Sequence, residues 1–98
     1  MPGKPVGRLV FRVHAIERMF ERRITEADVR GVLESGVAIE EYPHDTPFAS
    51  RLVLGLRGIR PLHVVAADAP DSDETIIVTA YEPDPDAWEP DFRTRRRQ

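Results

Sequence analysis

Apolar residues between positions 13 and 24 recur at the spacing of an α-helix. At about 100° per residue they fall on one side of a helical wheel, and we expect that side to be buried. These residues are Val13, Ile16, Met19, Phe20 and Ile24. His14, Arg18 and Arg22 follow one another at intervals of four residues, so they form a polar ridge nearly opposite the apolar side.

A second helix is expected to begin after Thr25. Thr25 is a good N-cap residue and Asp28 stands three positions later, as in a capping box. Glu26 and Asp28 also suit the positive end of the helix dipole. Gly36 is well placed to end this helix. Only residues 23–25 separate the two helices, so the sequence predicts a helical hairpin.

After Gly36 the apolar period changes from about 3.6 residues to two, which indicates strands. Ahead of the first helix, residues 8–13 form either a short strand or an irregular lead-in to that helix. The stretches that predict strands are 37–42, 51–56, 61–67 and 75–81. Two helices followed by these strands predict an α+β fold, with an N-terminal helical hairpin packed on a three- to four-stranded antiparallel sheet.

The chain length of 98 residues predicts a single domain, 1–98, with a core over about 9–92 and a basic tail at 93–98. Cysteine is absent, which excludes disulfides and thiolate metal sites. We find no apolar stretch typical of a signal peptide or of a membrane span. We therefore expect a cytoplasmic protein without a membrane partner.

Charge is unevenly distributed along the chain, although the net charge is only −3. Residues 1–30 carry seven Lys or Arg against four Asp or Glu, whereas residues 61–92 carry nine Asp or Glu and no Lys or Arg. Arginines then return in the tail at positions 93, 95, 96 and 97. This segregation builds a basic face, or it is only a solvated acidic loop followed by a frayed basic tail.

Several short motifs occur in an order that resembles one known family. The first half carries them in His14-Ala-Ile-Glu-Arg18-Met19, Arg22-Arg-Ile24 and Glu26-x-Asp28-Val29. The second half carries them in Glu41-Tyr42-Pro43, Leu52-x-Leu-Gly55, Arg60-Pro-Leu-His-Val-Val65 and Thr79-Ala-Tyr-Glu-Pro-Asp84 with Trp88. Over roughly residues 11–93 the chain resembles the domain-of-unknown-function family 4258. It departs from the family at Arg23, where glycine is common, and at Val13, where a polar capping residue is usual.

The resemblance implies a fold shared with RelE-like and ParE-like toxins. This group includes metal-independent ribonucleases that antitoxins hold inactive. Members of family 4258 can be encoded beside a small zinc-finger protein of antitoxin type. The resemblance therefore implies RNA and a small zinc-finger antitoxin as partners, and it implies no cofactor. It says nothing about the oligomeric state.

Metal-free RNA cleavage needs a base for the 2′-hydroxyl, a cation for the charge on phosphorus and an acid for the leaving oxygen. Side chains for proton transfer are His14, His63 and Tyr81, and arginines for the phosphate are Arg18, Arg22 and Arg51. We take His14, Arg18, His63 and Tyr81 as candidate catalytic residues. Arg22, Arg51 and Thr79 are candidate substrate-binding residues.

Strand alternation indicates where three of these side chains lie. If Leu62, Val64 and Ala66, together with Ile76, Val78 and Ala80, face the helices, the residues between them face the other way. His63, Thr79 and Tyr81 then share the open face of the sheet. His14 and Arg18 meet this face only if the end of their helix reaches the edge of the sheet.

Structural roles are the alternative for each candidate. His14 and Arg18 also fit a solvated helix face, where Glu17 and Glu21 form weak surface pairs with them. His63 also fits a strand histidine that neighbouring groups satisfy, and Tyr81 a half-buried aromatic at a sheet end. His14, His44 and His63 show no spacing diagnostic of a metal site, and no nucleotide-binding or nucleophile motif is present.

Two functions remain at this point. The first is a metal-independent endoribonuclease that acts as the toxin of a toxin–antitoxin pair. The second is a catalytically silent protein-binding module of the same fold, which uses the same sheet face or helix ridge. The acidic net charge favours the second function, because RNA binding by counterion release favours basic proteins.

Overall fold

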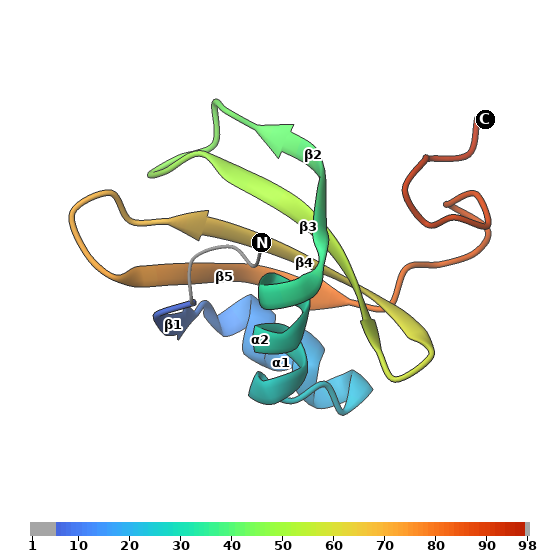
Figure 1. Ribbon diagram of the computed structural model, residues 1–98, viewed down its shortest axis with the longest axis horizontal. Helices are drawn as coiled ribbons and strands as arrows, with labels where there is room; N and C mark the ends of the chain where they lie inside the picture. Colours follow the sequence, from blue (N-terminus) through green and yellow to red (C-terminus); the bar gives the residue numbers. More distant parts are fainter. Residues whose placement is uncertain (1–5, 98) are drawn as a thin grey trace.

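The computed structural model describes residues 6–97 and contains two helices and five strands (Figure 1). Residues 1–5 and 98, which belong to the expected domain 1–98, lie outside the described residues. The elements are β1 (Arg8–Phe11), α1 (Val13–Arg22), α2 (Glu26–Ser35), β2 (Val37–Tyr42), β3 (Ser50–Arg57), β4 (Arg60–Asp68) and β5 (Glu74–Tyr81).

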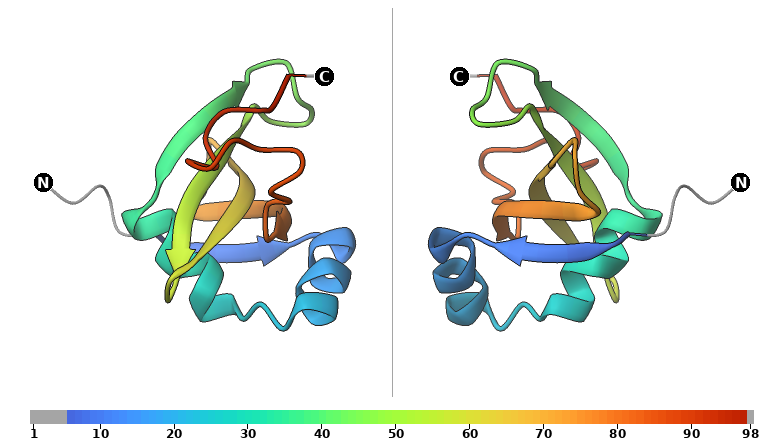
Figure 2. Two further views of the ribbon diagram at one scale, coloured as in Figure 1. Left: turned by 90° about the vertical axis from the view of Figure 1, so that its right-hand side faces the viewer. Right: turned by 90° about the vertical axis from the view of Figure 1, so that its left-hand side faces the viewer.

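All five strands form one sheet in the order β1-β5-β4-β3-β2. Strands β2 to β5 are antiparallel neighbours in chain order, whereas β1 runs parallel to β5 at the edge. Both helices lie on one side of the sheet, and the segment after β5 lies on the other side (Figure 2). The sheet therefore has two covered faces, one against the helices and one beneath the segment after β5.

The expected helical hairpin on a three- to four-stranded antiparallel sheet is wrong, because the fold is α+β with a five-stranded mixed sheet. Residues 8–11 pair with residues 74–77, and local periodicity cannot reveal a pairing between distant parts of the chain. The helices also pack separately, α1 on β5 and α2 on β3 and β4, so they do not cover the sheet as one hairpin.

Helix α2 begins as its sequence predicts, but Gly36 does not serve as the expected C′ residue of a left-handed helix end. The Thr25 hydroxyl accepts a hydrogen bond from the Asp28 amide at 3.1 Å, and the Asp28 carboxylate accepts one from the Thr25 amide at 2.9 Å. This reciprocal capping box is confirmed. Gly36 follows the helix with an extended backbone (φ −83°), so glycine is required here because a side chain would not fit. A Cβ there would collide with the carbonyl oxygens of Leu54 and Val32.

Helix α1 turns a different side to the sheet from the one its apolar residues predict. Ala15 and Met19 are buried, whereas Val13 and Ile16 are exposed and Phe20 is 85% exposed. The completely buried Ala15 lets the helix approach β5 closely, which places the small side of the helix on the sheet. The expected burial of Val13, Ile16 and Phe20 is therefore wrong.

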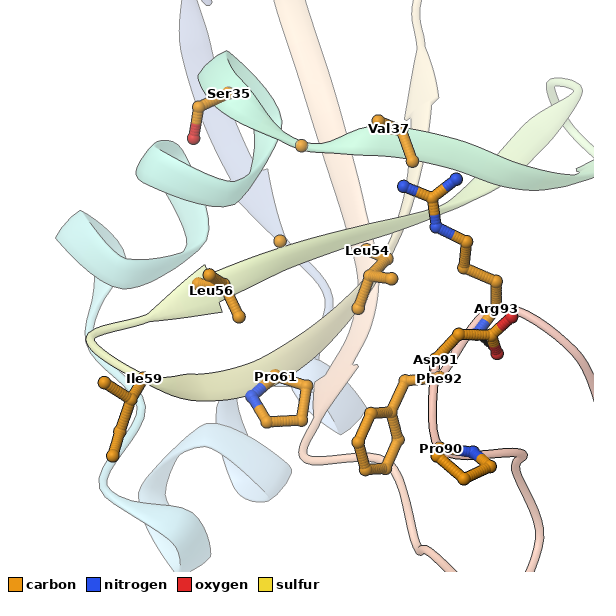
Figure 3. A pocket seen from close by; sticks show the side chains of 12 residues that line it. Ser35, Val37, Leu54, Leu56, Ile59, Pro61, Pro90, Asp91, Phe92 and Arg93 are labelled. Carbon is orange, nitrogen blue, oxygen red and sulfur yellow. Dashed lines mark hydrogen bonds between the residues drawn. The ribbon is translucent and has the colours of Figure 1, made fainter.

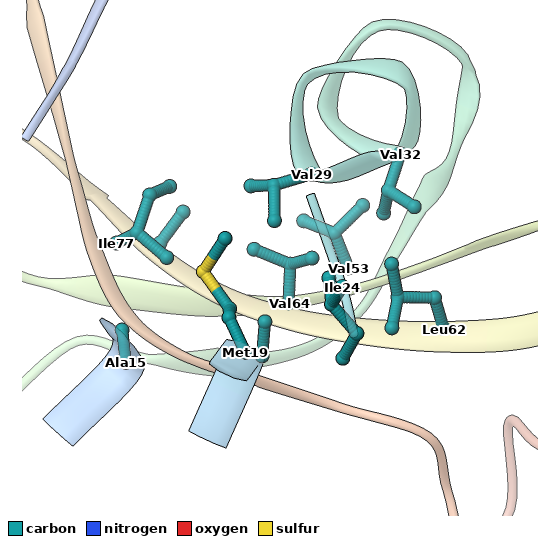
Figure 4. Close-up of a cluster of buried hydrophobic side chains, with 11 residues drawn as sticks. Ala15, Met19, Ile24, Val29, Val32, Val53, Leu62, Val64 and Ile77 are labelled. Atoms are coloured by element: carbon teal, nitrogen blue, oxygen red, sulfur yellow. The ribbon is translucent and has the colours of Figure 1, made fainter. Parts of the chain in front are cut away.

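The apolar core fills the space between the helices and the sheet (Figure 4). It draws buried aliphatic side chains from both helices, from the loop between them and from strands β3 to β5. Its members are Ala15, Met19, Ile24, Val29, Val32, Val53, Leu62, Val64, Ala66, Ile77 and Ala80.

A β-bulge between β4 and β5 changes which β5 residues face this core. Val65 pairs with Thr79 but Ala66 pairs with Ile77, so Val78 is an extra residue on β5. Ile77 rather than Ile76 consequently faces the helices. The prediction that Ile76, Val78 and Ala80 all face the helices is wrong for the residues before the end of the bulge. After the bulge the expected pattern returns, and Tyr81 pairs with His63.

The close approach of α2 to β3 predicts a large effect for one added methyl group. A Cβ at Gly55 would lie 2.9 Å from a Val32 methyl group and 3.0 Å from the Val32 Cα. We expect Gly55→Ala to lower the free energy of unfolding by about 1–3 kcal/mol. Gly31→Ala is the matched control, because a Cβ there meets nothing within 4 Å and alanine favours the helix by about 0.5–1 kcal/mol. Urea unfolding measures both changes in the free energy of unfolding. Equal effects of the two variants would contradict the close packing of α2 on β3 at Gly55.

Candidate functional site

The segment of residues 82–97, here called the covering segment, lies over the sheet face opposite the helices (Figure 2). Trp88 is only 4% exposed, and its ring meets the edge of the His63 ring at 4.5 Å between centroids. Within the segment the Glu89 amide donates to the Thr94 carbonyl and the Arg96 amide to the Ala87 carbonyl. The face that strand alternation predicts to be open is therefore covered at β4 and β5.

His63 is completely buried beneath this segment, and both ring nitrogens have partners. Nε2 lies 2.8 Å from the Phe92 carbonyl oxygen, and Nδ1 lies 3.3 Å from the Tyr81 hydroxyl. A carbonyl oxygen only accepts, so Nε2 carries the hydrogen and Nδ1 of the neutral ring accepts from Tyr81. Burial lowers the pKa of His63, which keeps the ring neutral at neutral pH.

Tyr81 connects the buried histidine to a surface cleft. This α1–β5 cleft has a volume of about 390 Å³ and is lined by Arg18, Arg22, Tyr81, Glu82, Asp84 and Trp88. The guanidinium carbon of Arg18 lies 5.9 Å from the centre of the Tyr81 ring, within the range of a cation–π contact. Burial raises the pKa of the Tyr81 hydroxyl, so this hydroxyl keeps its proton at neutral pH.

The two carboxylates of the cleft are engaged to different degrees. Glu82 accepts hydrogen bonds from Arg57 at 3.0 Å and from Arg60, so cations compensate its charge. The Asp84 carboxylate accepts from the Asp86 amide at 2.8 Å through Oδ1, and no cation among the described residues pairs with it. Sequence reasoning missed both residues as site residues, although they follow Tyr81 directly in a Tyr-Glu-Pro-Asp motif at the end of a strand.

The structure brings some of the predicted site residues together and separates others. Arg18, Arg22 and Tyr81 line one cleft, and His63 lies directly behind Tyr81. His14 is exposed and is not among the described residues that line this cleft. At about 100° per residue, its direction on α1 points further from the buried Ala15 and Met19 than that of Arg18 does.

Two further predicted site residues lie away from the cleft. Arg51 pairs with Asp68 at 3.0 Å, and both residues line a different pocket together with Thr75. Thr79 has a buried hydroxyl oxygen that finds no hydrogen-bond partner among the described residues. Neither side chain therefore takes part in the α1–β5 cleft in this conformation.

A charged network fastens the covering segment to β2. Arg95 donates to both carboxylate oxygens of Glu40, at 3.0 and 3.1 Å, and stacks over the Trp88 ring at 4.6 Å. The hydrogen bond from Arg95 lowers the pKa of Glu40. Tyr42 also donates to Glu40, at 2.6 Å, and burial with this carboxylate contact raises the pKa of Tyr42 to about 12. The sequence left a basic face and a frayed basic tail open for these arginines, and it did not predict that Arg95 pairs with Glu40.

Two features of other classes of protein are absent from the described part of the chain. No group of three or more His, Asp or Glu residues between 6 and 97 could hold a metal ion. Over the same residues, neither helix is long and apolar enough to cross a membrane.

The neutral, buried state of His63 predicts a stability change at mildly acidic pH. The unfolded chain takes up a proton at this histidine near pH 6.5, whereas the folded pKa is lower. The unfolded state thus binds more protons below pH 6.5, and the free energy of unfolding should fall as the pH drops through this range. Urea unfolding from about pH 7.5 to about pH 5.5 measures it. His63→Leu should weaken this dependence and His14→Gln, at an exposed position, should keep it; the reverse result would contradict the assignment.

These observations define the class of protein: a small α+β domain with an arginine–tyrosine cleft beside α1 and a covered sheet face that contains a buried histidine. The family model described as Domain of unknown function (DUF4258) matches residues 11–82, more than half of the chain. The chain belongs to this family. The matched range includes Arg18, Arg22, His63 and Tyr81, whereas the covering segment beyond residue 82 lies outside it. No significant match is found among curated proteins or among solved structures.

Proposed function

We propose that this protein is a metal-independent endoribonuclease, a RelE-like toxin of a toxin–antitoxin pair that acts in the cytoplasm. The observation that carries the proposal is the meeting of Arg18, Arg22 and Tyr81 in one cleft, with Arg18 over the Tyr81 ring. Two arginines beside a protonated phenol supply a cation for the phosphate and a proton donor for the leaving oxygen. The proposed partner that holds the site inactive is a small zinc-finger antitoxin.

Both proton transfers of the cleavage reaction can be assigned to residues of this cleft. The 2′-oxygen of RNA attacks the adjacent phosphorus, and its proton passes to the carboxylate of Asp84, whose Oδ2 is not used by the Asp86 amide. The bond from phosphorus to the 5′-oxygen breaks, and that oxygen takes the proton of Tyr81. The products carry a 2′,3′-cyclic phosphate and a 5′-hydroxyl. The 3.3 Å bond from Tyr81 to His63 is long, so the hydroxyl is free to turn towards a substrate.

Expression in bacteria without the antitoxin tests this proposal. The unaltered chain should stop growth, co-expression of the antitoxin should restore it, and Arg18→Ala should abolish the arrest. Arg51→Ala is the matched control, because Arg51 pairs with Asp68 outside the cleft. Normal growth with the unaltered chain, or equal arrest with Arg18→Ala and Arg51→Ala, would contradict the proposal.

A catalytically silent protein-binding module is the second candidate, and one observation favours it. Val13, Ile16 and Phe20 lie exposed on one side of α1 at the i, i+3, i+7 spacing of a helix-packing surface. This candidate predicts that no RNA is cleaved and that a partner protein binds α1. Its binding should be lost with Phe20→Asp and retained with Arg18→Ala. Cleavage of RNA by the chain would exclude it.

A further inference from the structure

Phe92 has a backbone conformation that is unfavourable for its side chain. Its φ angle is 56°, in the left-handed region that glycine adopts readily and bulky residues rarely adopt. Residues held in this way cluster at functional sites when the surrounding structure fixes them. The contacts around Phe92 hold its backbone in this conformation.

Hydrogen bonds on both sides of Phe92 impose this conformation. The Phe92 carbonyl accepts from Nε2 of the completely buried His63 at 2.8 Å, and its amide donates to the Glu89 carbonyl at 2.8 Å. Asp91 accepts from the following Arg93 and Thr94 amides at 2.9 and 3.2 Å. The turn is fixed at four points, so Phe92 cannot relax without breaking contacts of the buried histidine.

The result of this turn is the position of the Phe92 ring. The ring forms part of the wall of a cavity of about 480 Å³, here called the apolar pocket (Figure 3). Leu54, Leu56 and Pro61 supply other parts of the wall, and Asp91 and Arg93 supply charged groups beside it. The volume lies in the range of small-molecule binding sites, and the hollow is half open, with apolar residues in the majority along its wall.

The apolar pocket continues into the α1–β5 cleft. Phe92 and Pro61 also line a neighbouring pocket of about 380 Å³, together with Arg22 and Arg60. That middle pocket in turn shares Arg22, Glu82 and Asp84 with the α1–β5 cleft. The three neighbouring hollows, here called the groove, share wall residues; two arginines and two carboxylates line the Arg18 end, and the Phe92 end is more apolar.

We propose that the apolar pocket holds one base of a single-stranded RNA that is bound along the groove, stacked on Phe92. This proposal rests on the proposed function and deepens it. A nucleotide joins an anionic phosphate to a flat base with hydrogen-bonding edges, which matches arginines at one end of the groove and an aromatic wall at the other. Arg93 lines the same pocket and supplies a hydrogen-bond donor for the edge of such a base, whereas both carboxylate oxygens of Asp91 accept from Arg93 and Thr94.

Binding of RNA that cannot be cleaved tests the base site without a change to the protein. The probes are a fully 2′-O-methylated single-stranded RNA hexamer and six copies that each lack one base. Loss of the base in the pocket should weaken binding about 5- to 150-fold, since stacking on an aromatic ring contributes about 1–3 kcal/mol per base. Loss of bases elsewhere should have smaller effects. Equal binding of all seven probes would overturn the base site.

Substitution of Phe92 gives the second arm of the test. Phe92→Leu should weaken binding of the intact hexamer by a similar factor and should remove the penalty for the missing base, whereas Phe92→Tyr should retain both. Phe20→Leu is the matched control on an exposed helix face and should change nothing. An unchanged affinity with Phe92→Leu, or binding of a protein instead of RNA in the pocket, would overturn the inference.

Failure of the base site and failure of the proposed function give different results. If unmodified RNA is cleaved while the hexamers bind equally, the base site is wrong and the ribonuclease remains. If RNA is neither bound nor cleaved, both are wrong. A single position at which the missing base weakens binding to the native protein but not to Phe92→Leu supports the base site.

Discussion

Replacement of Tyr81 by phenylalanine is expected to lower the rate of RNA cleavage by about 10²- to 10⁴-fold, the usual contribution of a proton-transfer group. The hydroxyl is the only group lost, and it is the proposed proton donor; the Tyr81 ring contacts Arg18 and its hydroxyl contacts His63. The ring stays, so the contact with Arg18 and the edge-on packing against His63 at 5.3 Å remain. Single-turnover cleavage of a short RNA measures the change.

Tyr42→Phe is the matched control for this prediction. Tyr42 lies outside the α1–β5 cleft and donates its hydroxyl hydrogen to Glu40 at 2.6 Å. Loss of this bond should lower the free energy of unfolding by about 1 kcal/mol and leave cleavage unchanged. A similar loss of cleavage with both variants would contradict a proton-transfer role for Tyr81.

Replacement of Trp88 by alanine is expected to have the largest effect on stability. Trp88 is 4% exposed and packs between the His63 ring and the Arg95 guanidinium. Loss of such a buried aromatic side chain should lower the free energy of unfolding by about 3–5 kcal/mol. Urea unfolding measures the loss. Hydrogen exchange should also show weaker protection of the Glu89 and Arg96 amides, which close the covering segment.

Phe20→Ala is the control for the stability effect. It removes an aromatic ring that is 85% exposed on α1, so the free energy of unfolding should change by no more than about 0.5 kcal/mol. Equal losses for Phe20→Ala and Trp88→Ala would show that burial under the covering segment does not stabilise the fold.

The sequence predicted the parts of the fold that depend on neighbouring residues. The capping box of Thr25 and Asp28 lies within one turn, and the strands of β2 to β5 follow one another through short connections. Contacts between distant residues could not be predicted in this way. The parallel pairing of β1 with β5 and the bulge at Val78 depend on how the whole sheet assembles.

The rotation of α1 shows a second limit of sequence patterns. The apolar residues of this helix cover more of its circumference than the sheet buries, and a helical wheel cannot say which part faces inwards. The side with Ala15 and Met19 faces β5 and is buried. Phe20 is left exposed as a result, and Arg18 and Arg22 come to the edge of the buried side, beside Tyr81.

Only those parts of the candidate site that depend on local geometry could be predicted from the sequence. Arg18 and Arg22 are one helical turn apart, and His63 and Tyr81 are direct neighbours on adjacent strands, so each pair follows from local geometry. The burial of His63 does not follow, because it depends on residues 82–97 folding back over the sheet. Without that segment the left-handed turn at Phe92 and its pocket could not be recognised.

The central claim is that Arg18, Arg22 and Tyr81 form a metal-independent ribonuclease site, and product analysis of RNA tests it most directly. Purified protein is incubated with single-stranded RNA in excess EDTA, and the fragment ends are identified by mass spectrometry. We predict fragments with 2′,3′-cyclic phosphate and 5′-hydroxyl ends from the native protein and from Arg51→Ala, but none from the double variant Arg18→Ala/Arg22→Ala. Intact RNA with the native protein, cleavage that EDTA abolishes, or equal cleavage by the double variant would contradict the claim.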